Sequence, residues 1–186
     1  INSSISNNIK TEFGGHSKKC FDSDLAVISP GINYNEKIIQ ELLDKKIPLM
    51  TEIEFASQFT DGKIIGITGS NGKSTTVTIL KAIFDEIYKN TYLGGNIGIS
   101  FSHNVLKEIK YKSKNTIHIL ELSSFQLEHI GSFKTDFACF LNISSDHLDR
   151  HLTFENYFNI KKNIIKSLHI SNKFLYNADD YYLNQQ

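Results

Sequence analysis

Residues Gly66 to Thr76 read GITGSNGKSTT, a run of glycines, serines and threonines around one lysine. Glycine frees backbone N–H groups to point at phosphate oxygens, and a following helix adds its positive end. In such a loop Lys73 reaches the outer phosphates of a nucleotide, and the Ser74 hydroxyl binds Mg²⁺. The glycines are shifted from the Walker spacing, which requires one at the position of Ile67. The alternative is a plain glycine turn before a helix.

Three further polar segments follow apolar stretches. Glu121 ends the apolar run NTIHILE, and a carboxylate at the carboxyl end of a parallel strand can hold the Mg²⁺ of a nucleotide. SSDHLDRH is dense in titratable groups and favours a metal or phosphate site, although no nearby cysteine supports zinc. In YLGGNIG the glycines allow close backbone approach, and Asn96 offers a donor and an acceptor. The alternatives are a surface ion pair, a solvated capping loop and a bare turn.

Alternating strand-like and helix-like stretches must position these residues. The pattern predicts an α/β fold with parallel sheets in two units, joined by a polar linker at Thr60–Lys63. The expected strands cover residues 25–31, 47–50, 63–69, 90–98, 115–124, 136–142 and 173–180. The expected helices cover residues 35–46, 51–59, 73–88 and 153–168.

Composition narrows the function classes. The 186 residues carry a formal net charge of zero, which argues against a general nucleic-acid-binding protein. The two cysteines, Cys20 and Cys139, lie far apart, and this favours a reducing cytosol over a disulfide scaffold. No apolar run reaches the length of a membrane span, and the first ten residues lack the apolar core of a signal peptide.

Taken in order, TGSNGKST, GGNIG, ELSSFQLE and DHLDRH followed by ENYFNIKK resemble the Mur ligases, the ATP-dependent amide-forming enzymes of peptidoglycan synthesis. That family has its own form of the phosphate loop, with the same shifted glycines. The motifs are most similar to the members that add D-glutamate to UDP-N-acetylmuramoyl-L-alanine through an acyl phosphate. The resemblance implies a cytoplasmic enzyme of cell-wall synthesis, cell shape and cell division. It also implies a monomer at full length, without nucleic acid or membrane insertion.

The resemblance also implies how the chain is divided. Upstream, EFGGHS and SPGI resemble the later part of the family's uridine-nucleotide-binding domain. Residues 1–60 are then the remainder of this Rossmann-like N-terminal domain. Residues 61–186 are a truncated, P-loop-type parallel-sheet ATPase domain. The family's C-terminal domain, which binds the amino acid, has no counterpart, so we expect this chain alone to be inactive as a ligase.

Site residues carry over from the resemblance by motif. The first Mg²⁺ is expected at Ser74 and Glu121, and His147 is expected to bind a second Mg²⁺. Lys161, four residues after Tyr157, matches a lysine that CO₂ carbamylates, and its carboxylate then shares Mg²⁺. The adjacent Lys162 is the alternative for that lysine. The residues expected to bind ATP are Gly69, Ser70, Asn71, Gly72, Lys73, Ser74 and Thr75. The expected catalytic residues are Lys73, His147 and Lys161, and the expected contacts to the UDP-sugar are Asn96 and Ser123.

Three other functions stay open at this point. One is another ligase of the same superfamily, such as a folylpolyglutamate synthase or a different Mur enzyme. The second is a nucleotide-binding module without catalysis of its own. The third, a generic P-loop kinase, is disfavoured by the segments around Asn96 and Glu121.

Overall fold

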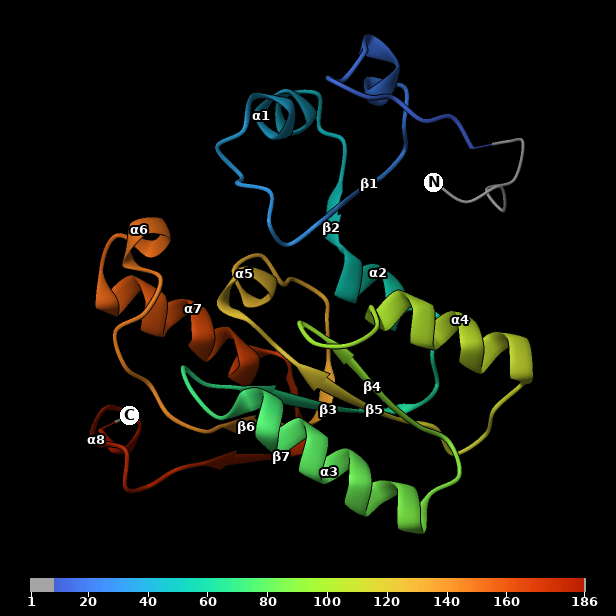
Figure 1. The fold of residues 1–186 in the computed structure, drawn as a ribbon. Coiled ribbons are helices and arrows are strands. Elements are labelled where there is room, and N and C mark those ends of the chain that lie inside the picture. The colour runs from blue at the N-terminus through green and yellow to red at the C-terminus, as the bar shows by residue number, and fades with distance from the viewer. Residues whose placement is uncertain (1–8, 186) are drawn as a thin grey trace.

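The computed structural model describes residues 9–185, apart from the side chains of residues 169–171. The first ten residues, in which the sequence shows no signal-peptide core, therefore lie mostly outside the described residues. A small N-terminal unit is joined through the helix α2 (Glu52–Ser57) to a larger unit built on a central sheet (Figure 1). In the described residues no helix has the length and apolarity needed to cross a membrane.

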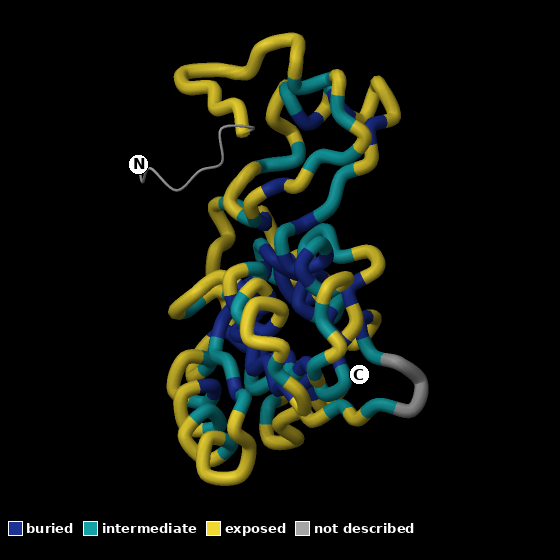
Figure 2. The backbone as a smooth tube through the Cα atoms, turned by 90° about the vertical axis from the view of Figure 1, so that its right-hand side faces the viewer, coloured by how far each residue is buried: buried dark blue, intermediate teal, exposed yellow. Residues whose placement is uncertain are grey.

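The small unit is a parallel βαβ arrangement, as its pattern predicts. Strands β1 (Ala26–Ile28) and β2 (Leu49–Thr51) pair in parallel, and helix α1 (Lys37–Asp44) connects them. A short 3₁₀ helix, η1 (Lys18–Phe21), precedes β1. The core of this unit is small, and most of its surface is exposed or half-buried (Figure 2).

The larger unit is a five-stranded, fully parallel sheet in the order β4-β5-β3-β6-β7. Its strands are β3 (Lys63–Thr68), β4 (Thr91–Gly95), β5 (Ile117–Glu121), β6 (Thr135–Phe140) and β7 (Leu168–Tyr176). Its helices are α3 (Lys73–Ile87), α4 (Phe101–Tyr111), α5 (Ser124–Leu127), α6 (Leu148–His151), α7 (Phe154–Lys166) and α8 (Tyr181–Asn184).

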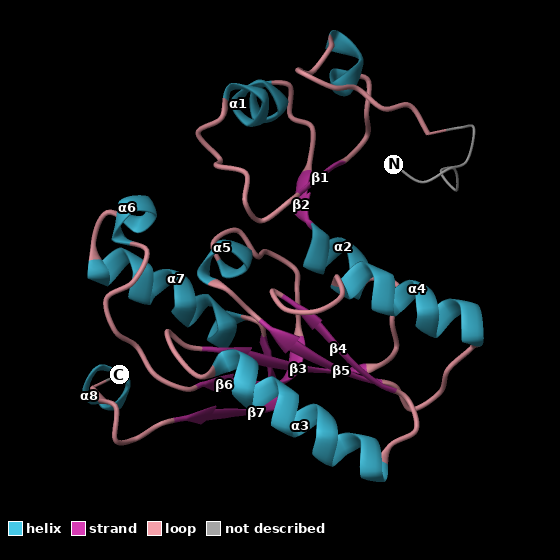
Figure 3. Ribbon diagram, viewed as in Figure 1, coloured by secondary structure: helices cyan, strands magenta, loops and turns pink. Residues whose placement is uncertain are grey.

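Different helices cover the two faces of this sheet (Figure 3). On one face α3 packs Val77 against Ile67 and Ile119 of the central strands. On the other face α2, α4, α5 and α7 form the larger core, with Phe101 and Ile164 among its fully buried side chains. Burial on both faces explains why the central strands are nearly continuous apolar runs.

The sequence pattern missed α4 and the short helices α5, α6 and α8. In α4 two buried positions are polar, which interrupts the apolar stripe that marks a helix. Asn104 donates to the Leu93 carbonyl at 2.8 Å, and Glu108 Oε2 lies 2.8 Å from His118 Nε2. β7 begins at Leu168, earlier than the strand that the pattern predicts at residues 173–180.

The topology brings the carboxyl ends of β3, β5 and β6 to one edge, because these strands are neighbours and parallel. The glycine-rich loop, Glu121 and the segment that follows β6 therefore meet there. At this edge β4 approaches β5 very closely: a Cβ on Gly95 would lie 2.2 Å from the Glu121 carbonyl oxygen. Gly95 also has a φ of 93°, in the left-handed region that favours glycine.

We expect Gly95→Ala to lower the free energy of unfolding by about 3 kcal/mol, since it adds both a clash and backbone strain. Gly98→Ala is the matched control. Gly98 also has a positive φ, of 73°, but the nearest atom to its Cβ position is 4.0 Å away. Strain alone at Gly98 should cost about 1 kcal/mol. Urea unfolding of both variants measures the difference, and equal losses would contradict the close approach at Gly95.

Candidate nucleotide and metal site

The glycine-rich loop lies between β3 and the 15-residue helix α3. Gly72 is the N-cap of α3 with a φ of 80° and no side-chain cap. The Thr76 N–H donates to the Gly72 carbonyl, so by helix geometry the three preceding N–H groups have no acceptor within the helix. These N–H groups and the positive end of the helix macrodipole form a binding position for an anion.

Lys73 folds back over this loop. Its Nζ donates to the Gly69 carbonyl at 2.8 Å and to the Ser70 carbonyl at 2.9 Å. The half-buried ammonium therefore lies beside the free N–H groups of α3. The loop thus combines a fixed cation with a helix N-terminus, and both attract phosphate.

Glu121, at the end of β5, is held by two partners. Its Oε2 accepts from Ser74 Oγ at 2.7 Å, and its Oε1 accepts from Asn96 Nδ2 at 2.9 Å. The Asn96 N–H also donates to the Glu121 carbonyl at 2.8 Å. The expected metal pair Ser74 and Glu121 is therefore in direct contact. Asn96, expected as a substrate residue, orients this carboxylate.

Lys161 approaches the same loop from α7, on the opposite face of the sheet. The side chain is 1% exposed, and Nζ donates to the Gly69 carbonyl at 2.8 Å. Burial and, to a smaller extent, the charge of Lys73 lower the pKa of Lys161 to about 7, whereas Asp146 and Glu121 oppose the shift. A large share of its amine is therefore neutral near pH 7, the form that is nucleophilic.

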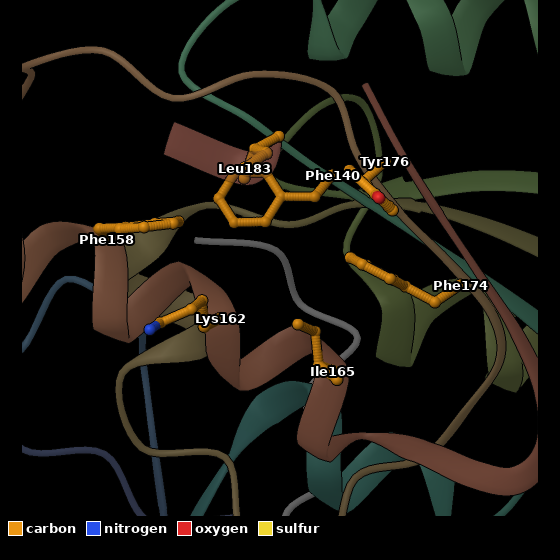
Figure 4. Close-up of a pocket in the computed structure, with 7 residues that line it drawn as sticks. All are labelled: Phe140, Phe158, Lys162, Ile165, Phe174, Tyr176 and Leu183. Atoms are coloured by element: carbon orange, nitrogen blue, oxygen red, sulfur yellow. The ribbon is translucent and has the colours of Figure 1, made fainter. Parts of the chain in front are cut away.

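Lys162 points to a different place. Its Nζ lies 4.9 Å from the centre of the Phe158 ring, and its side chain lines a cavity of about 260 Å³ with Ile165, Phe174 and Leu183 (Figure 4). Burial separates the two lysines. The buried positions of α7 are 157, 158, 160, 161 and 164, which include Lys161, whereas Lys162 is half-buried.

Tyr157 contacts several parts of the site, although the sequence motifs used it only as the position from which Lys161 is counted. The centre of its ring lies 5.0 Å from Lys161 Nζ and 6.4 Å from the centre of the His147 ring. Its hydroxyl lies 3.2 Å from Ser70 Oγ in the loop. The side chain is 1% exposed and forms part of the core, so its contact with the loop could be found only from the fold.

His147 and Ser123 lie around this centre. His147 precedes α6 with a left-handed φ of 50°, and its half-exposed ring stands 5.2 Å from the Phe125 ring and 3.5 Å from Asp146 Oδ2. Ser123 caps α5: its hydroxyl accepts from the Gln126 N–H and donates to Gln126 Oε1. Ser123 therefore has a structural role here, and contact with a substrate would be an additional one.

The donor set fits Mg²⁺ in part. Mg²⁺ takes oxygen ligands, and proteins hold it with one or two carboxylates together with water and substrate phosphates. Ser74 Oγ and Glu121 supply such oxygens next to the phosphate loop. The unmodified Lys161 amine does not fit, whereas a carbamate on its Nζ would. Among residues 9–185 no group of three or more His, Cys, Asp or Glu gathers as a metal site.

Known proteins match the chain over both units. Residues 67–186 match the family model of the Mur ligase middle domain. A curated relative from Koribacter versatilis, a UDP-N-acetylmuramoylalanine–D-glutamate ligase, is 42% identical over 176 residues. The match covers 92% of this chain but only 37% of the relative, so the chain spans little more than a third of its length.

Solved structures share the fold at low identity. A Neisseria meningitides ligase that joins UDP-N-acetylmuramate to L-alanyl-gamma-D-glutamyl-meso-diaminopimelate superposes with a TM-score of 0.60 at 14% identity, over 90% of this chain and 56% of that one. A MurF ligase from Thermotoga maritima in complex with ADP gives 0.52 at 20% identity, over 88% of this chain and 44% of that one. The family model covers well over half of the residues, and the chain therefore belongs to the Mur ligase family.

Proposed function

We propose that this chain is the nucleotide-binding part of an ATP-dependent ligase that adds D-glutamate to UDP-N-acetylmuramoyl-L-alanine in peptidoglycan synthesis. The observation that carries the proposal is the meeting of Lys73, Lys161 and the Ser74–Glu121 pair at one loop. The name of the curated relative supports the substrates, and the ADP complex of the T. maritima ligase supports the nucleotide. In this proposal residues 1–60 belong to the UDP-binding domain and residues 61–186 to the ATP-binding domain. The enzyme is cytoplasmic and monomeric.

The proposed reaction has two steps. The alanyl carboxylate attacks the γ-phosphorus of ATP, which gives an acyl phosphate and ADP. The amine of D-glutamate then attacks the acyl carbon, and phosphate leaves. The main electrostatic obstacle is the approach of a carboxylate to a triphosphate, because both are anions. Positive groups at the phosphate loop therefore contribute most to catalysis.

The residues of the chain divide this work. The N–H groups at the start of α3 bind phosphate oxygens, and Lys73 Nζ, already 2.8 Å from the Gly69 carbonyl, supplies the cation. Asn96 orients Glu121, which together with Ser74 would hold Mg²⁺. When bound, Mg²⁺ neutralises charge on the transferred phosphoryl group. We propose His147 for a second Mg²⁺, and Asn96 and Ser123 for contacts to the UDP-sugar.

We also propose that Lys161 is carbamylated. Because the pKa of its buried amine is about 7, much of Lys161 is neutral near pH 7, and the neutral amine is the form that adds to CO₂. In this step the nitrogen forms a bond to the carbon of CO₂, and the amine loses a proton. The product is a carboxylate beside the loop, which can act as a ligand of Mg²⁺. Placement favours Lys161 over Lys162, since Lys161 Nζ donates to the Gly69 carbonyl of the loop, whereas Lys162 lines the cavity beside Phe158.

A nucleotide-binding module without catalysis is the second candidate. This chain spans 37% of the relative's length. The remaining length of the relative is enough for a separate amino-acid-binding part, and this favours the second candidate. Under this reading, the site described above binds Mg·ATP, and ligation requires residues outside the chain.

Lys73→Ala in the full-length protein should lower kcat by a factor of 10² to 10³, about 3–4 kcal/mol, by analogy with removed oxyanion donors. Circular dichroism and the unfolding midpoint should stay unchanged, because the side chain is only half-buried. The control is Lys81→Ala, on the same helix, where the lysine pairs with Asp85 at the surface. Near-normal turnover of Lys73→Ala at saturating ATP would contradict the assignment.

Lys161→Ala should also abolish ligation, and short carboxylic acids should restore part of the activity by replacing the carbamate. Lys162→Ala is the matched control and should keep activity near wild type. With ¹³C-bicarbonate, a carbamate ¹³C signal is expected in wild type and in Lys162→Ala, and it should be lost in Lys161→Ala. The reverse pattern would place the modification at Lys162.

The 186-residue chain alone should not form the D-glutamate product. We propose that the rest of the ligase holds the amine of D-glutamate, because this chain spans only 37% of its relative. Separated from that part, the chain loses the advantage of positioning, roughly 7–11 kcal/mol at its largest. The chain is incubated with ATP, UDP-N-acetylmuramoyl-L-alanine and D-glutamate, and the product is followed by mass spectrometry. A rate comparable to that of a complete ligase would refute the expectation.

A further inference from the structure

The segment after β6 forms a series of hydrogen bonds with the phosphate loop. Pairing between β3 and β6 continues past their ends: the Leu141 N–H donates to the Thr68 carbonyl at 2.9 Å, and the Ser70 N–H donates to the Asn142 carbonyl at 3.0 Å. Farther along, the Ser144 N–H donates to Ser70 Oγ at 3.0 Å. The loop thus lies along residues 141–144 as if along a neighbouring strand.

Asn142 makes the most specific contact in this arrangement. Its Oδ1 accepts from the Asn71 N–H at 2.9 Å, and its Nδ2 donates to the Asn71 carbonyl at 3.0 Å. A side-chain amide donates and accepts at once, whereas a carboxylate only accepts. The two bonds fix the backbone of Asn71 on both its N–H and its C=O side.

This contact bears directly on the groups that face phosphate. Asn71 precedes Gly72, whose φ of 80° turns the chain into α3. The direction of the free N–H groups of Lys73 and Ser74 depends on that turn. Because the Asn71 N–H is used by Asn142, the phosphates are left to the N–H groups that follow it.

We propose that Asn142 is a positioning residue that holds the phosphate loop in its anion-binding conformation. The inference rests on the proposed nucleotide-binding function and deepens it. In this proposal Asn142 acts on the phosphate loop through Asn71. Loss of the two hydrogen bonds from Asn142 frees the Asn71 peptide to rotate. Phosphate binding must then order the N–H groups at the start of α3, and this costs free energy.

Two substitutions of Asn142 test this proposal. Asn142→Ala removes both bonds, and Asn142→Asp keeps the acceptor but places a carboxylate against the Asn71 carbonyl. We expect both to weaken Mg·ADP binding to the full-length protein at least tenfold, measured by calorimetry. Asn90→Ala is the matched control, since its Nδ2 donates to the Lys114 carbonyl at 2.8 Å, in a loop that precedes β5. It should bind as wild type does.

A second readout separates positioning from general loss of structure. In Asn142→Ala the Asn71 amide should exchange with solvent at least tenfold faster, while the unfolding midpoint stays within a few degrees of wild type. Binding within twofold of wild type in both Asn142 variants overturns the inference and leaves the proposed function standing. The inference is also overturned if the Asn142 variants lose binding only in proportion to a lowered unfolding midpoint. A wild-type protein that binds no Mg·ADP overturns the proposed function and this inference with it.

Discussion

The carbonyl oxygen of Gly69 accepts hydrogen bonds from two lysines, and the rest of the site depends on this contact. Lys73 reaches it from α3 on one face of the sheet, and Lys161 reaches it from α7 on the other, each at 2.8 Å. Burial disfavours the charged form of Lys161, and the nearby charge of Lys73 acts in the same direction. Together they lower the pKa of Lys161 to about 7.

The parallel sheet makes this meeting possible. Helices on opposite faces come together only at the edge where the strands end, and a loop at that edge can be contacted from both sides. Tyr157 closes the remaining space, because its ring covers the Lys161 amine and its hydroxyl reaches Ser70. The large core around α7 fixes the backbone of that helix, and this holds the buried lysine in register with the loop.

Sequence reasoning reached the parts of the site that depend on local order. The apolar run before the glycines, the helix after them and the strand ending in Glu121 are visible in the order of residues, and the structure places Ser74 against Glu121. It missed α4, whose buried Asn104 and Glu108 are polar because other elements supply their partners. The contact of Tyr157 with the loop spans 87 residues of sequence, so no local pattern could predict it.

The proposed carbamate would change the electrostatics of this centre in a specific way. A neutral amine at Lys161 leaves Lys73 as the cation on the Gly69 carbonyl, whereas a carbamate adds a negative charge close to it. Burial then acts twice. It favours the neutral amine that reacts with CO₂, and it strengthens the attraction between the product carboxylate and Lys73, because charges interact more strongly where water is excluded. With Glu121 on β5, the site would hold two carboxylates facing one phosphate loop, and bound Mg²⁺ lets such carboxylates lie close to the phosphates of a nucleotide.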